Sequence, residues 1–332
     1  CAALLAWLAS RVDGFDLASA GELDKVATLG LAVSFAGPGK RDTELEAAIT
    51  AGVTINLESE GEAARALAIA DRLGATPKLA IRVNPPFGLK SAGMKMGGQG
   101  TQFGVDAERV PALIRTLLDA GADWQGLHIY AGSQALHAEA VSTLQRETLA
   151  LVAHISAEAG AVPRHVNLGG GFGIPYFAGD LPLDLEAVGD SLARQLEALP
   201  KTSTHSIELG RWLVGEAGVY LTRVIDRKVS GGKTFLVTDG GLHHMLAASG
   251  NFGQLLRRNY PIANASRFGE EPRQEVTVTG CLCTPLDLLG DEVMLPPTEV
   301  GDLIAIFCAG AYGLSASPQG FLSQPEAREL LL

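Results

Sequence analysis

The most informative stretch of this chain is a run of three consecutive glycines, Gly169, Gly170 and Gly171, which follows a short apolar segment. Glycine adopts positive φ angles without steric cost and has no Cβ to hold a ligand away. Successive backbone N–H groups in such a bend can close on an anion such as a phosphate. Glycine triplets also occur in plain turns, so the stretch indicates a binding site only if other residues with suitable chemistry accompany it.

Two later segments supply these companions. Glu208-Leu209-Gly210-Arg211 follows the next strand-like segment, and Gly310-Ala311-Tyr312-Gly313 lies near the C-terminus. They add a carboxylate, a guanidinium and a phenol to the backbone amides, and arginine forms strong charge-assisted bonds to phosphate. Together these are the parts needed to hold a pyridoxal phosphate. A plain salt bridge between Glu208 and Arg211, and a core position for Tyr312, are the alternatives.

The composition is that of a globular protein with ample material for a core: of the 332 residues, 47% are hydrophobic and 19% are charged. The formal net charge of −11 argues against a nucleic-acid partner. No uninterrupted apolar run approaches the roughly 20 residues that span a bilayer. Four cysteines do not make a disulfide framework, and the Cys281-x-Cys283 pair has no second pair to complete a metal site. We expect a cytoplasmic enzyme without a metal and without a membrane partner.

The first two-thirds of the chain alternate strand-like runs with stretches of helical spacing. Strands are expected at 15–18, 33–36, 53–57, 78–83, 126–130, 166–168 and 206–208, and helices at 20–29, 41–51, 60–73, 111–120, 138–159 and 183–199. Such units imply parallel strands, and their number favours an α/β fold of the (β/α)8 TIM-barrel type. From about Gly218 strands follow without long helices, which indicates an all-β domain. We therefore predict a barrel domain over 1–217 and a β-sandwich or barrel-like domain over 218–332.

Catalytic groups of such a barrel lie where strands end and loops begin. Each single polar residue there could be ordinary loop chemistry, but many of them converge on one rim. They are Asp16, Arg82, Asn84, His128, Tyr130, Ser133, the three glycines, Glu208 and Arg211.

At this point the chain resembles the fold type III, alanine-racemase-like pyridoxal-phosphate decarboxylases, the group of diaminopimelate and ornithine decarboxylases. The matching stretches run in the family's order over nearly the whole chain: Gly14 to Ser19, Arg82 to Pro85, Gln102 to Gly104, Gly126 to Gln134, Leu168 to Tyr176, Glu208 to Arg211, Asp239 to Gly241, Cys283 to Asp287 and Gly310 to Gly313. The segments Cys283 to Gly290 and Phe321 to Pro325 look like the branch associated with exosortase A systems.

The resemblance implies roles for the cofactor-binding residues. Glu208 matches the acid that pairs with the pyridine nitrogen of pyridoxal 5'-phosphate and keeps the ring an electron sink. Arg211, Tyr312, Ser133 and the three glycines match the phosphate site, and Asp16 matches a further residue at the cofactor. The family commonly stacks an imidazole on the ring where this chain has Tyr130. We expect Tyr130 to stack there and His128, on the same strand face, to orient deeper groups, although a core histidine remains an alternative.

The resemblance also implies a second set of residues. Cys283 matches the cysteine that the partner subunit contributes and that protonates Cα, although free cysteine is also a common small buried hydrophobe. Asp287 and Asp239 match acids of the substrate side. Thr284 is a departure, because ornithine and diaminopimelate decarboxylases carry an acid there that faces the distal end of the substrate. The distal group is therefore expected to differ, being neutral or larger.

Members of the family carry the cofactor on a lysine at the end of the first barrel strand. None of the chain's lysines has a matching place, and the spacing puts that lysine just before Cys1. The expectation is an N-terminally truncated chain that lacks this strand and is inactive as given. For the intact protein we expect a homodimeric amino-acid decarboxylase with shared sites and a small-molecule amino-acid substrate. The alternatives are an amino-acid racemase of the same fold and a non-catalytic homologue that acts by protein binding.

Overall fold

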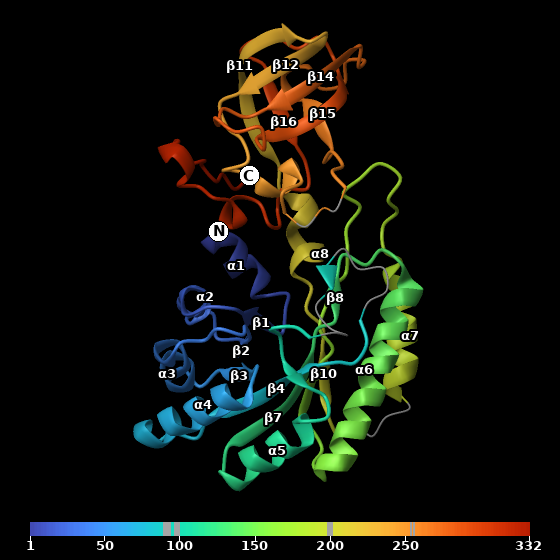
Figure 1. The fold of residues 1–332 in the computed structure, drawn as a ribbon. Helices are drawn as coiled ribbons and strands as arrows, with labels where there is room; N and C mark the ends of the chain where they lie inside the picture. The colour runs from blue at the N-terminus through green and yellow to red at the C-terminus, as the bar shows by residue number, and fades with distance from the viewer. Residues whose placement is uncertain (89–93, 96–99, 198–201, 253, 255) are drawn as a thin grey trace. The chain divides into compact units, whose positions relative to one another are not determined.

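The computed structural model describes residues 1–88, 94–95, 100–197, 202–252, 254 and 256–332. It divides into two compact units (Figure 1). Unit 1 comprises residues 1–171, 184–208 and 331, and unit 2 comprises 172–183, 209–330 and 332. The domain boundary expected at 217/218 stays a prediction.

Unit 1 is built on a parallel sheet with strand order β1-β2-β3-β4-β7-β9-β10, and β6 also pairs with β4. Its strands are β1 (Gly14–Leu17), β2 (Ala32–Phe35), β3 (Thr54–Leu57), β4 (Lys78–Asn84), β6 (Val105–Asp106), β7 (Asp123–Ile129), β9 (His165–Asn167) and β10 (Thr204–Ser206). A short antiparallel pair joins β5 (Met94–Lys95) to β8 (Gly132–Ser133). The sequential order of parallel neighbours is that of a TIM-type barrel, as the sequence predicts.

The helices of unit 1 connect these strands. They are α1 (Ala2–Leu8), α2 (Ala20–Val26), α3 (Asp42–Thr50), α4 (Glu60–Leu73), α5 (Val110–Asp119), α6 (Ala138–Ala159) and α7 (Leu185–Glu197). Their ends follow local chemistry. In α4 the Ser59 hydroxyl accepts a hydrogen bond from the Glu62 N–H at 3.1 Å, and Gly74 closes the helix with a φ of 62°. Residues 198–199 of the helix expected at 183–199 lie outside the described residues.

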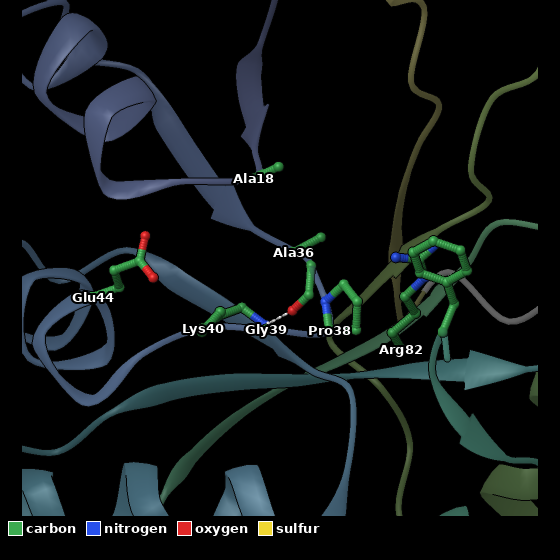
Figure 2. Close-up of a pocket in the computed structure, with 9 residues that line it drawn as sticks. Ala18, Ala36, Pro38, Gly39, Lys40, Glu44 and Arg82 are labelled. Carbon is green, nitrogen blue, oxygen red and sulfur yellow. Dashed lines mark hydrogen bonds between the residues drawn. The ribbon is translucent and has the colours of Figure 1, made fainter. Parts of the chain in front are cut away.

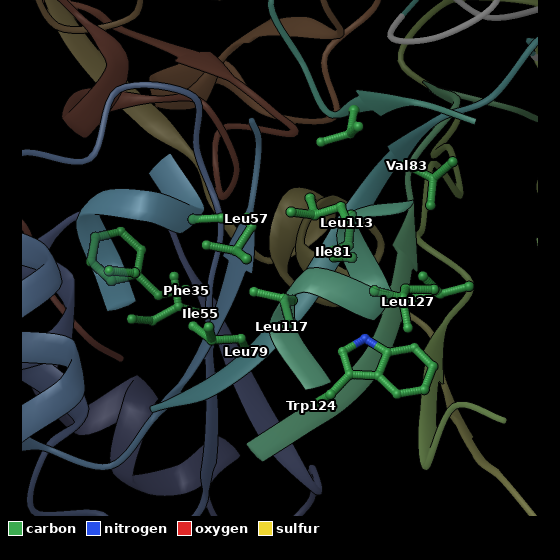
Figure 3. Packing of buried hydrophobic residues seen from close by; sticks show 14 of the residues in the cluster. Phe35, Ile55, Leu57, Leu79, Ile81, Val83, Leu113, Leu117, Trp124 and Leu127 are labelled. Carbon is green, nitrogen blue, oxygen red and sulfur yellow. The ribbon is translucent and has the colours of Figure 1, made fainter. Parts of the chain in front are cut away.

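Side chains alternate along the strands of unit 1, so that one face of the sheet carries the hydrophobic core and the other carries polar residues. In β4 the side chains of Leu79, Ile81 and Val83 are fully buried in a hydrophobic cluster, together with Phe35 and Trp124 (Figure 3). Successive side chains of a strand point to opposite faces. The even-numbered residues of β4, which include Arg82, therefore face the other side of the sheet.

Unit 2 contains a six-stranded sheet with the order β13-β16-β11-β12-β14-β15, antiparallel except between β12 and β14. The strands are β11 (Tyr220–Ser230), β12 (Lys233–Thr238), β13 (Ile262–Asn264), β14 (Gln274–Thr279), β15 (Leu288–Leu295) and β16 (Leu303–Ile306). Short helical turns accompany them: α8 (Gly210–Val214), η1 (Gly215–Ala217), η2 (Leu246–Ser249), η3 (Ala265–Arg267), η4 (Leu314–Ala316) and η5 (Phe321–Ser323). The expected all-β character is confirmed. β13 and β15 are strands that the sequence reasoning did not identify.

Candidate cofactor site

A belt of polar side chains crosses the inner face of the unit 1 sheet at one level. Asp16 is in register with Ser34, Arg82 with His128, and His128 with Asn167. Residues in register project to the same face, so these side chains gather in one place. Arg82, His128 and Asn167 are all buried.

Glu208 lies two residues after β10, the last strand in the order of the sheet, and contacts two members of this belt. One of its carboxylate oxygens, Oε1, lies 2.7 Å from His128 Nε2 and accepts a hydrogen bond from Asn167 Nδ2 at 2.9 Å. Burial alone would raise the pKa of Glu208, but His128, Arg82 and the Asn167 hydrogen bond together hold that pKa below its usual range. Glu208 is therefore an ionised carboxylate, of which about 20% remains exposed.

The three glycines form a bend against the backbone of unit 1, close to Glu208. A Cβ on Gly169 would stand 2.3 Å from the Ile129 carbonyl oxygen, one on Gly170 1.9 Å from the Glu208 carbonyl oxygen, and one on Gly171 2.2 Å from the Gly132 carbonyl oxygen. Gly169 and Gly171 also have φ values of +70° and +88°. Only glycine fits at all three positions.

Ser133 lies beside this bend. Its Cα would be 3.3 Å from a Cβ at Gly171, its side chain is buried, and its hydroxyl has no hydrogen-bond partner among the described residues. A buried polar group usually has a partner, so this hydroxyl is suited to an external acceptor. The bare glycine bend, the unpartnered hydroxyl and the ionised Glu208 together fit a ligand that carries a phosphate at one end and a basic ring nitrogen at the other.

Arg82 is held in place by a buried acid that the sequence reasoning did not single out. Glu58 Oε1 accepts from Arg82 Nη1 at 2.9 Å and from the Gly37 N–H at 2.7 Å, and Glu58 Oε2 accepts from the Gly104 N–H at 2.7 Å. The Arg82 guanidinium also lies 4.7 Å from the centre of the Phe103 ring. Glu58 thus connects two loops of unit 1, those of Gly37 and Gly104, to the arginine whose charge lowers the pKa of Glu208.

A cavity of about 370 Å³ opens next to Arg82 (Figure 2). Its lining is mostly small and apolar, and the Lys40 ammonium beside it donates to the Gly37 carbonyl and to Glu62 Oε1. All its lining residues belong to unit 1: Ala18, Ala36, Gly37, Pro38, Gly39, Lys40, Glu44, Arg82 and Phe103.

Asp16 completes the belt on β1. The side chain of Asp16 is exposed on one side. Its carboxyl nevertheless loses hydration against the protein, and this desolvation, together with the charge of Glu208, raises the pKa of Asp16 to about 6 from its usual 3.8. Asp16 Oδ1 lies 3.5 Å from Asn167 Nδ2. Tyr130, at the end of β7, is half-buried.

The raised pKa of Asp16 predicts a pH dependence of stability. Between about pH 4 and pH 6 Asp16 in the folded cofactor-free protein holds a proton that the unfolded chain releases, so the contribution of Asp16 to stability is lost as the pH rises through this window. We expect Asp16→Asn to remove this contribution, so that the stability of the variant relative to the wild type rises across the window. Urea unfolding midpoints measured across this pH range test the prediction, and an unchanged slope in the variant would contradict it.

In unit 2 the predicted residues fall into three groups. The Arg211 guanidinium donates to the Tyr176 hydroxyl at 2.8 Å and lies 4.4 Å from the centre of the Tyr312 ring. Tyr312 itself has a φ of +54° and is 41% exposed. The structure thus brings Arg211 and Tyr312 together within unit 2.

The second group surrounds the loop that carries Cys283, whose side chain is exposed. Asp287 is buried and accepts hydrogen bonds from the Leu242 N–H at 2.6 Å and from the Leu282 N–H at 2.8 Å, so its carboxylate joins two loops.

The two remaining residues predicted on the substrate side make local hydrogen bonds in unit 2. Asp239 Oδ1 accepts from the Thr222 hydroxyl and from the Arg223 N–H, both at 2.8 Å. The Thr284 hydroxyl accepts from the Leu286 N–H at 3.3 Å.

Comparisons with known proteins agree with this geometry. Residues 2–215 match the family model of the pyridoxal-dependent decarboxylase, pyridoxal binding domain. The chain therefore belongs to the pyridoxal-dependent decarboxylases, and its cofactor is pyridoxal phosphate. Within the described residues, no cluster of three or more potential metal ligands occurs, and no helix has the length and apolar character to cross a bilayer.

Individual relatives are similar over nearly the full chain. An L-glutamyl-[BtrI acyl-carrier protein] decarboxylase of Niallia circulans is 37% identical over 96% of this chain and 77% of its own length. A 2-[(L-alanin-3-ylcarbamoyl)methyl]-2-hydroxybutanedioate decarboxylase of Staphylococcus aureus is 31% identical over 99% of this chain and 84% of its own length. The structure of Helicobacter pylori diaminopimelate decarboxylase in complex with L-lysine superposes with a TM-score of 0.85, at 27% identity over 98% of this chain and 80% of that one.

Proposed function

We propose that this protein removes the α-carboxylate of an amino acid and that Glu208 is the residue on which the reaction depends. The observation that supports this is the ionised Glu208 carboxylate, held by His128 and Asn167 beside a glycine bend. Pyridoxal phosphate, when bound, supplies an electron sink for the electron pair of the Cα–carboxylate bond. Glu208 would hold a proton at the pyridine nitrogen, and His128 would keep Glu208 oriented.

The phosphate would bind at the glycine bend and at the Ser133 hydroxyl, which has no other partner among the described residues. We propose that Arg211 and Tyr312 of unit 2 bind the same phosphate, and that Tyr130 packs on the ring. The exposed Cys283 thiol would deliver the proton to Cα after CO2 has left. A homodimer in which each subunit lends Cys283 to its partner's site is part of this proposal.

The substrate is proposed to carry an uncharged, extended distal group. By the resemblance to the family, Thr284 replaces an acid that would face the distal end of the substrate. Its hydroxyl accepts a hydrogen bond from the Leu286 N–H. A relative named for the decarboxylation of a glutamyl group on an acyl-carrier protein also supports a substrate with a large, uncharged distal group. We therefore propose as the substrate class an amino acid that is joined to a carrier through its side-chain carboxyl, because its α-carboxylate then stays free to leave as CO2. Asp239 and Asp287 would shape the adjoining loops.

One assay tests both the decarboxylation and the substrate class. The intact protein is supplied with pyridoxal phosphate, and CO2 release is measured from free ornithine, lysine and diaminopimelate and from a γ-glutamyl thioester of pantetheine, whose α-carboxylate is free. We expect release from the thioester and little from the free diamino acids. Release from the diamino acids alone would overturn the substrate class. Loss of optical rotation without CO2 would overturn the decarboxylase proposal in favour of a racemase. The exosortase-associated branch and a cytoplasmic location stay predictions.

A further inference from the structure

Asn167 connects the two halves of the proposed cofactor site. It is the last residue of β9, is 5% exposed, and lies two residues before the glycine bend. Its Oδ1 accepts a hydrogen bond from the Gly169 N–H at 2.9 Å, and its Nδ2 donates to Glu208 Oε1 at 2.9 Å. A longer contact of 3.5 Å joins Nδ2 to Asp16 Oδ1.

These bonds fix the orientation of the amide. Because an N–H group can only donate, the atom that faces Gly169 must be the oxygen, and the NH2 group then faces the two carboxylates. The backbone reinforces the link, since the Glu208 N–H donates to the Gly169 carbonyl at 2.9 Å. The glycine bend and the Glu208 carboxylate are therefore cross-linked by one side chain and one main-chain bond.

We propose that Asn167 is a positioning residue that sets the phosphate-binding bend and the ring-binding carboxylate at a fixed relation to each other. The inference rests on the proposed function, in which the bend binds the phosphate and Glu208 binds the ring nitrogen. Rigid spacing between the two ends matters because a bound cofactor must satisfy both at once, and preorganised groups lose little freedom on binding.

Only an amide meets both demands at this position. Aspartate could still accept from the Gly169 N–H, but it would bring a further negative charge beside Glu208 and Asp16 and could not donate to an ionised Glu208. Leucine is similar in size and can do neither. The variants Asn167→Asp and Asn167→Leu therefore separate the two contacts of the side chain.

The experiment measures the Kd of pyridoxal phosphate for the intact protein and the pH dependence of the absorbance of the bound cofactor. We expect Asn167→Leu to weaken binding about tenfold or more, the range for losing a bond to a charged group. We expect Asn167→Asp to retain more affinity than Asn167→Leu, because it keeps the Gly169 contact. The pH-dependent change in the absorbance of the bound cofactor should move to higher pH in Asn167→Asp. The added negative charge raises the pKa of the ionisable groups beside Glu208.

Gln125→Glu, the same kind of amide-to-acid change near the start of β7, serves as the control and should leave both readouts unchanged. Circular dichroism shows whether each variant is folded. If both Asn167 variants are folded and match the wild type in Kd and pH profile, the positioning role is wrong. Equal losses of affinity with an unmoved pH profile would also overturn it, since Asn167 would then act on the bend alone. If the wild type itself fails to bind pyridoxal phosphate, the proposed function fails instead.

Discussion

Replacing Glu208 by glutamine should reduce kcat roughly 10²–10³-fold, the cost of removing one preorganised electrostatic group from an active site. Glutamine keeps the shape of the side chain and can still accept from Asn167 Nδ2, so the fold should survive. It lacks the negative charge that would stabilise a protonated pyridine nitrogen. The steady-state rate of CO2 release by the intact protein, measured with saturating substrate and pyridoxal phosphate, tests the prediction.

The control for this variant is Glu186→Gln on α7, where the carboxylate is exposed. That change should leave kcat within about twofold of the wild-type value, as expected for a surface position away from the site. A Glu208→Gln variant that binds the cofactor and keeps wild-type kcat would contradict the role proposed for this acid. The two variants have the same charge change, so a general charge effect would appear in both.

Replacing Gly170 by alanine should impair the site and the stability of unit 1 together. The new Cβ would stand 1.9 Å from the Glu208 carbonyl oxygen, so the bend or the Glu208 backbone has to move. Overpacking of this kind costs about 1–3 kcal/mol of unfolding free energy. We expect the affinity for pyridoxal phosphate to fall as well, because the same movement displaces the bend from Glu208. Urea unfolding and cofactor titration measure the two effects.

Gly189→Ala provides a matched control with the opposite sign. Gly189 lies inside α7, is exposed, and has open space where a Cβ would be placed. Alanine there should stabilise the protein by about 0.5–1 kcal/mol and leave cofactor binding unchanged. Equal behaviour of the two variants would show that the close approach at Gly170 has no energetic consequence.

Much of unit 1 was predictable because its signals are local. The helix expected at 60–73 is α4 without any shift, since Ser59 caps its start and Gly74 ends it in the left-handed conformation. The glycine bend was predictable for the same reason, because glycine identity alone reports a backbone that tolerates no Cβ. The chemistry of Glu208 came from the resemblance to the family.

Other features depended on contacts between distant residues and left no local signal. β15 contains Gly290, Asp291 and Glu292, which are poor strand formers, and it forms through pairing with β14. The coupling of Glu58 to Arg82, and of Asn167 to Glu208, joins a residue of one strand to a residue just after the end of the neighbouring parallel strand. Register is set by tertiary packing, so a pattern of residues in one strand does not reveal which polar side chains will meet.

A crystal structure of the intact protein with pyridoxal phosphate tests the central claim most directly. The account predicts that Glu208 lies within hydrogen-bonding distance of the pyridine nitrogen. It also predicts the phosphate at the bend of Gly169, Gly170 and Gly171, within reach of the Ser133 hydroxyl. A cofactor whose ring nitrogen faces another residue, or whose phosphate binds away from this bend, would contradict it.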